Sequence, residues 1–162
     1  MESLRFLIGS WSGSGVEQFP TLPTFDYREH LVFEWLEPWQ ILRYAQRAQK
    51  REQGTAVWLP SHVELGLIKA DEQGGYLLYN CQNSRVEWMH GNLKADNDEW
   101  VLDWQSLGFG GDPRMQAATR RWRFQDHLLF CDQAMCTDKV PTVTAHLSIQ
   151  LARVDSLTPW GE

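Results

Sequence analysis

The chain has 162 residues, 43% of them hydrophobic, and a formal net charge of −6. This length and composition predict one domain over residues 1–162, large enough to bury a core. The acidic balance and the lack of a basic run argue against nucleic acid as a partner.

The N-terminal residues are too few and too polar for a signal peptide, and no apolar stretch approaches membrane-spanning length. We therefore expect a cytoplasmic protein with no membrane contact. Cys81, Cys131 and Cys136 show no Cys-x-x-Cys spacing, which predicts packing thiols rather than a disulfide frame or a zinc site. Nine tryptophans suit either a broad packed sheet or a lined cavity.

The first predicted element is a short helical turn over Glu2–Ile8, with Leu4 and Leu7 on one side. A strand rich in glycine follows over Gly9–Gly15, where Trp11 shares a face with the glycines. Repeated glycine in a strand indicates a bend or a close approach of backbone. Prolines at 20 and 23 then end the strand.

The rest of the chain alternates strand patterns with short runs of turn-forming residues. The predicted strands cover residues 26–35, 41–48, 57–68, 76–82, 85–94, 100–107, 115–124, 128–136 and 143–154. About ten strands with short connections form a meander, and a meander of this length usually closes. The prediction is an all-β, antiparallel, up-and-down β-barrel that encloses a pocket for one ligand.

The last predicted strand contains the strongest chemical candidate, His146. Alternation places it with Thr144 and Ser148 on a polar face, opposite Leu147 and Ile149. The pattern alone leaves two interpretations open, a histidine at the surface or a histidine ligand of haem iron. The acidic residues read as turn and surface charges, and Arg120–Arg123 reads as a solvated outer stripe or as a cationic cluster inside the barrel.

Two segments resemble the nitrobindins, a family of haem-binding barrels similar to lipocalins and fatty-acid-binding proteins. The first is Gly-x-Trp-x-Gly-x-Gly-x-x-x-Phe-Pro-Thr-Leu, from Gly9 to Leu22. The second is Pro-x-x-x-x-His-Leu-x-x-x-Leu-x-Arg, from Pro141 to Arg153. This resemblance implies haem b as the cofactor.

The resemblance also assigns site residues. It implies that His146 is the proximal iron ligand and turns inward, through a bulge or because outer apolar residues are covered. The segment Ser61–Lys69 resembles the family's His-x-Glu-x-Gly segment, so that His62 would line the cavity. Met135 is expected near the pocket, and Trp11 and Thr21 of the first motif are expected to contact the cofactor.

The function implied by the resemblance is binding of nitric oxide at ferric haem and isomerisation of peroxynitrite to nitrate. No catalytic residue is identified, and a homodimer remains open. The alternative is an intracellular carrier of a fatty acid or another lipophilic molecule, whose head group would be held by Arg43, Arg121 or Arg123. The Arg-x-Tyr pair common near the end of fatty-acid-binding proteins is missing after Arg153.

Overall fold

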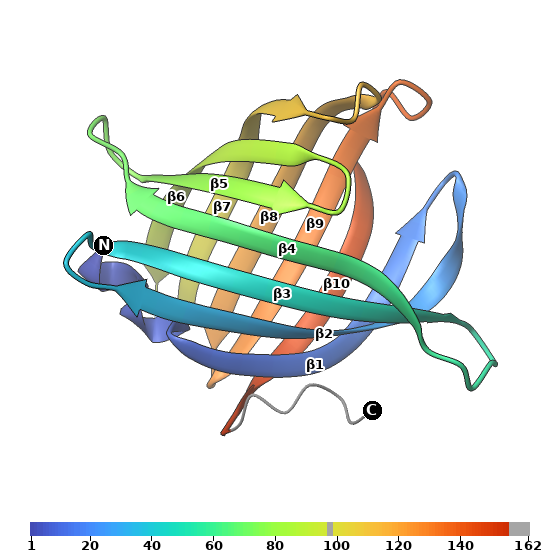
Figure 1. The fold of residues 1–162 in the computed structure, drawn as a ribbon, viewed down its shortest axis with the longest axis horizontal. Helices are drawn as coiled ribbons and strands as arrows, with labels where there is room; N and C mark the ends of the chain where they lie inside the picture. Colours follow the sequence, from blue (N-terminus) through green and yellow to red (C-terminus); the bar gives the residue numbers. More distant parts are fainter. Residues whose placement is uncertain (97–98, 156–162) are drawn as a thin grey trace.

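The protein folds as a closed antiparallel barrel, described here from a computed structural model for residues 1–96 and 99–155 (Figure 1). A 3₁₀ turn, η1 (Glu2–Leu7), precedes ten strands. The strands are β1 (Gly9–Phe19), β2 (Leu22–Leu36), β3 (Ile41–Glu52), β4 (Leu59–Ala70), β5 (Tyr76–Gln82), β6 (Val86–Asp96), β7 (Glu99–Gly110), β8 (Met115–Gln125), β9 (Leu128–Thr137) and β10 (Thr144–Val154).

Each strand pairs with its neighbours in sequence, and β1 pairs with β10 to close the barrel. The predicted up-and-down β-barrel and its helical turn are therefore confirmed. Several boundaries differ from the predictions. The third strand was predicted to end at residue 48, but β3 continues to Glu52 because it keeps pairing with β2 up to that residue. Similarly, β2 begins at Leu22 rather than at residue 26.

The glycines of β1 allow this strand to lie against the backbone of β10. A Cβ atom on Gly13 would lie 1.9 Å from the Gln150 carbonyl oxygen, and one on Gly15 would lie 2.1 Å from that of Ser148. Side chains at these positions would push the two strands apart. The repeated glycines thus mark a close backbone approach at the closure of the barrel.

Two ends of the barrel can be distinguished. At the η1 end, η1 lies beside the β2–β3 turn, whereas the β1–β2 hairpin lies at the other end (Figure 1). We call the second end the His146 end, because β10 begins there shortly before His146. It also carries the β3–β4, β5–β6, β7–β8 and β9–β10 connections.

The lumen near the η1 end is filled by apolar side chains. Leu4 and Leu7 of η1 are completely buried, and the indole Nε1 of Trp11 donates to the Leu7 carbonyl oxygen at 2.8 Å. Trp104 and Trp122 pack edge to face with ring centroids 5.6 Å apart. In contrast, Trp39 and Trp88 are exposed, so the tryptophans both fill the lumen and cover the outer wall.

Among the described residues, no helix is long and apolar enough to cross a membrane. The three cysteines are free thiols, with Cys131 and Cys136 buried and Cys81 exposed.

Candidate functional site

The middle of the lumen holds a buried ionic cluster, which separates the apolar η1 end from the His146 end. Arg120 on β8 donates to both oxygens of Glu64 on β4, at 2.7 and 3.1 Å, and to Glu87 on β6 at 2.7 Å. The side chains of Arg120, Glu64 and Glu87 are each at most 3% exposed. Tyr44 on β3 donates its hydroxyl to Glu64 at 2.7 Å. The Arg120 contacts cross the lumen between strands that do not pair with one another, whereas Tyr44 and Glu64 lie on neighbouring strands.

The charges in this cluster stabilise one another. Burial alone would raise the pKa of Glu64, but Arg120 and His62 overcome burial and hold the pKa of this carboxyl well below its usual range. Burial also opposes the charge on Arg120, and its carboxylate partners nevertheless raise the pKa of the guanidinium. Glu64 and Arg120 are therefore both charged at neutral pH.

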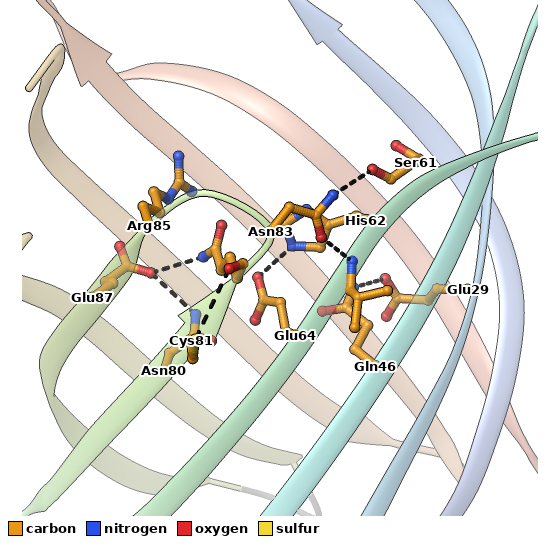
Figure 2. Close-up of polar contacts among 12 residues, drawn as sticks. Glu29, Gln46, Ser61, His62, Glu64, Asn80, Cys81, Asn83, Arg85 and Glu87 are labelled. Atoms are coloured by element: carbon orange, nitrogen blue, oxygen red, sulfur yellow. Dashed lines mark hydrogen bonds and ion pairs between the residues drawn. The ribbon is translucent and has the colours of Figure 1, made fainter. Parts of the chain in front are cut away.

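Glu29 on β2 lies in the same polar layer but has a different protonation behaviour. Figure 2 shows it beside Gln46 of β3, whose amide donates to the Glu29 carboxyl group. Burial raises the pKa of Glu29 to about 7, with the Glu64 charge acting in the same direction. Roughly half of the Glu29 side chains are thus protonated at neutral pH.

His62 lies at the edge of this cluster, toward the His146 end. Its Nε2 is 2.7 Å from Oε1 of Glu64 (Figure 2). Because the Glu64 carboxylate can only accept, the His62 ring carries its proton on Nε2. A carboxylate that fixes the tautomer and orientation of a histidine is a common arrangement in functional sites.

His146 turns into the barrel because β10 contains a bulge. The pairing of β10 with β9 shifts register between Ala145 and Leu147, so that the strict alternation is broken at His146. His146 Nδ1 lies 3.2 Å from the Gln18 carbonyl oxygen, and the ring packs edge to face on Phe19. Its side chain is 19% exposed. The resemblance left two explanations for an inward His146, a bulge or a cover over the outer apolar residues. The structure has the bulge.

The His146 imidazole has the chemistry of a metal ligand. Burial lowers its pKa, which favours the neutral ring at pH 7. A neutral ring that donates from Nδ1 to the Gln18 carbonyl keeps the lone pair on Nε2. The nearest acidic atom to Nε2 is Oε1 of Glu17 at 3.8 Å, beyond hydrogen-bond distance. This donor set fits an iron porphyrin, which needs one protein nitrogen.

The enclosed space beside His146 is small. His146 and His62 both line a cavity of about 30 Å³, together with Glu17 and Tyr27. A second cavity of about 10 Å³ is lined by His146, Met135 and Arg85. Pockets that hold cofactors measure about 300–1,000 Å³. A porphyrin would therefore have to lie toward the His146 end, above the ionic cluster, and side chains there would have to move apart.

A much larger groove of about 770 Å³ borders His146 from the other side of the wall. Several of its lining residues, such as Asp103, Arg121 and Ser148, alternate with lumen residues along their strands. The buried residues Trp104, Arg120 and Leu147 also border it. The Arg121–Asp103 and Ser148–Asp132 contacts cross this outer face. The groove is thus an external surface of the sheet.

The structure brings together three of the five residues expected at the site. His146, His62 and Met135 lie around the small cavities at the His146 end. Trp11 lies near η1, about six strand positions away from Glu17, which corresponds to roughly 20 Å. Thr21 is exposed in the β1–β2 turn.

The three arginines offered to a lipid head group all face outward. Arg43 pairs with Glu34, Arg121 with Asp103, and Arg123 with Glu99. The buried cation of the lumen is Arg120, which two carboxylates neutralise. None of these three arginines therefore places a free charge in the lumen for a lipid head group.

The sequence analysis missed the buried acidic residues. Glu29, Glu64 and Glu87 were read as turn or surface charges, but all are at most 2% exposed. Strand alternation contained the signal, because Glu29 shares its phase with Tyr27 and Leu31, which face the lumen. The cationic stripe was likewise only partly outward, since Arg120 faces inward.

Comparisons with known proteins show the family to which the chain belongs. A family model described as "THAP4-like, heme-binding beta-barrel domain" matches residues 1–153. A protein of Mycobacterium leprae named peroxynitrite isomerase is 32% identical over 125 residues, which is 76% of this chain and 74% of that protein. A Nocardia farcinica protein of the same name is 27% identical over 155 residues, 93% of this chain and 89% of that protein.

The crystal structure of Rv2717c from M. tuberculosis superposes with a TM-score of 0.80 and 25% identity, covering 94% of this chain and 96% of that one. The family match spans nearly the whole chain, and the solved structure has the same fold. This chain belongs to the THAP4-like haem-binding β-barrel family, the nitrobindins.

Proposed function

We propose that this protein binds haem b at the His146 end, with His146 as the iron ligand, and that the loaded protein binds nitric oxide and isomerises peroxynitrite to nitrate. The observation that carries the proposal is the inward His146 ring, whose Nδ1 is bonded to the Gln18 carbonyl while Nε2 is uncommitted. Membership in a haem-binding family and relatives named peroxynitrite isomerase support it.

Several residues of this chain would prepare the site. The bond to Gln18 fixes the tautomer and the plane of the His146 ring, and Phe19 packs against its edge. Glu64 holds the His62 ring with its proton on Nε2. Met135, which is partly buried, contributes a polarisable thioether to the same region.

Ferric haem, when bound, would supply a Lewis acid toward a small ligand. The barrel's contribution is to provide one nitrogen ligand, to orient it, and to limit the approach of water. His62, whose Nε2–H is bonded to Glu64, lies at the edge of the same region.

Hemin titration tests the proposal. We expect wild-type protein to bind hemin with a sharp Soret band, and His146→Ala to lose at least tenfold in affinity with a shifted band. His90→Ala is the matched control, because His90 lies partly buried on the outer face and bonds the Gly74 carbonyl. Loaded wild-type protein should accelerate peroxynitrite decay with a raised nitrate yield. Unchanged hemin affinity and spectrum in His146→Ala would overturn the proposal.

A further inference from the structure

Among the residues that the structure describes, Arg85 at the His146 end forms no direct ion pair. It lies in the short β5–β6 connection, where the Gln82 amide donates to the Arg85 carbonyl oxygen at 2.8 Å and closes the turn. Its guanidinium Nη1 contacts only the Met115 sulfur, at 3.3 Å. Its Nε is buried and has no hydrogen-bond partner within residues 1–96 and 99–155.

Arg120, which is buried, differs from Arg85 because its charge is paired with carboxylates. Arg120 bonds both oxygens of Glu64 and one of Glu87. Glu87 is also engaged by Asn80 and Gln82 (Figure 2). Figure 2 shows Arg85 outside this set of dashed contacts, and no carboxylate of the described chain lies within 4.0 Å of its guanidinium. Glu64 and one oxygen of Glu87 are therefore bonded to Arg120, whereas the other oxygen of Glu87, Oε1, has no hydrogen-bond partner among the described residues.

An unpaired, partly buried guanidinium is costly, and an anion that pairs with it recovers that cost. Burial lowers the pKa of Arg85 and Arg120 acts in the same direction, whereas the carboxylates of Glu87, Glu64 and Asp112 oppose this shift. An arginine stays protonated at any physiological pH. Two free N–H groups in a planar fork match two oxygens of one planar anion. The chemistry of Arg85 thus favours an oxyanion such as a carboxylate or nitrate.

The position of Arg85 connects this charge with the candidate iron ligand. Arg85, His146 and Met135 line the same cavity of about 10 Å³, together with Glu87 and Arg120. An oxyanion would enter it only after these side chains move apart. Burial is the main cause of the lowered pKa of His146, and the positive charge of Arg85 is close enough to lower this pKa further. An anion held by Arg85 would therefore lie beside the His146 ring, at the end of the barrel where the cofactor would enter.

We propose that Arg85 is an oxyanion-binding site at the His146 end. This proposal rests on the proposed function, which supplies two candidate oxyanions. One is a propionate carboxylate of haem, and the other is a free planar anion such as peroxynitrite or nitrate. Both present two oxygens in one plane to the Arg85 guanidinium.

The first arm of the test uses apo protein and needs no haem. Sodium acetate and sodium nitrate are titrated while NMR follows the Nε–H resonance of Arg85. We expect a saturable shift of this resonance in the wild-type protein, and the resonance of Arg114, which already pairs with Asp112 through two contacts, should not move. If neither anion shifts the Arg85 resonance, the proposal is overturned, whether or not the protein binds hemin.

The second arm identifies the source. Hemin and hemin dimethyl ester, which lacks the free carboxylates, are titrated into wild type, Arg85→Gln and the control Arg114→Gln. If a propionate is the partner, Arg85→Gln should weaken hemin binding about tenfold and leave the ester unchanged. If a free oxyanion is the partner, Arg85→Gln should leave both affinities unchanged but weaken acetate and nitrate binding to the apo protein at least tenfold.

Arg85→Lys provides a second variant that keeps the charge but loses the planar fork, so its anion affinity should fall between those of wild type and Arg85→Gln. Anion affinities that are equal in wild type and Arg85→Gln would overturn the proposal. Failure of the proposed function would look different, because loss of hemin binding in every protein would leave the apo anion titration intact.

Discussion

Arg120 and Glu64 are 56 positions apart in the sequence and are joined across the lumen by two hydrogen bonds of 2.7 and 3.1 Å. They come from β8 and β4, which are not neighbours in the barrel. Their contact, extended by Glu87 and Tyr44, is a polar layer between the packed η1 end and the His146 end. The layer limits how deeply any ligand can enter, because breaking it would expose buried charges.

Removing the cation of this layer should strongly destabilise the fold. In Arg120→Met, Glu87 loses its counter-ion, and Glu64 keeps only its contacts with His62 and Tyr44. We expect the unfolding free energy to fall by about 3–5 kcal/mol. Arg121→Met is the control, because Arg121 forms an exposed pair with Asp103 and should cost less than about 1 kcal/mol. Urea denaturation of the two variants measures the difference, and equal losses would contradict a structural role for Arg120.

The buried carboxyl group of Glu29 should make stability depend on pH. Its folded-state pKa of about 7 lies above the ordinary value of 4.5, so between these values the folded protein binds more protons than the unfolded chain. The contribution of Glu29 to the unfolding free energy should therefore be largest below pH 4.5. It should fall as pH rises through 7, by about 3 kcal/mol in total.

Glu29→Gln, which cannot ionise, should flatten this decline. The measurement is unfolding free energy by urea at several pH values from 5 to 8, in wild type and variant. The other charged groups that act on Glu29, namely Glu64 and Arg120, are present in both proteins. Parallel curves for the two proteins would show that Glu29 does not titrate in this range.

Gly66 leaves space for the Tyr44 ring. A Cβ atom at Gly66 would lie 2.0 Å from Cε1 of Tyr44, whose hydroxyl bonds Glu64. Because Tyr44 is buried, Gly66→Ala should lower the unfolding free energy by about 1–3 kcal/mol. Gly108→Ala also meets an aromatic ring, at 2.2 Å, but Trp88 is 40% exposed and can move outward. A larger loss of stability in Gly108→Ala than in Gly66→Ala, by thermal or urea unfolding, would refute this explanation.

Arg153 of β10 holds η1 against the barrel through hydrogen bonds. Its guanidinium donates to the carbonyl oxygens of Phe6 and Ile8, both at 2.5 Å, and lies 4.4 Å from the Trp11 ring centroid. We expect Arg153→Ala to cost about 1.5–3 kcal/mol, the range for hydrogen bonds to charged groups. Hydrogen exchange at the Leu4 and Ile8 amides, which close the turns of η1, should accelerate.

Arg5→Ala is the control for this experiment. Arg5 also belongs to η1, but its ion pairs, with Glu2 and Glu37, are exposed. Hydrogen exchange at Leu4 and Ile8 should stay close to wild type in this variant. Similar acceleration in both variants would mean that Arg153 has no special role in holding η1.

Much of the fold follows from local patterns along the chain. Alternation with period two, broken by turn residues, was enough to count the strands and to infer closure, because side chains in a strand alternate between faces whatever the neighbouring strand is. The glycines of β1 likewise indicated a close backbone approach, since only a residue without a side chain fits there.

The site depended on contacts that local patterns do not contain. Alternation turned His146 outward, and the bulge that turns it inward exists only because β10 pairs with β9 in a shifted register. The partner of Glu64 could not be read from the chain either, because Arg120 reaches it only after the barrel closes. The sequence by itself determined a ten-stranded barrel with a histidine near its last strand's start. Only the tertiary structure decided which charges meet in the lumen, because pairing across a closed sheet depends on the register of every strand between them.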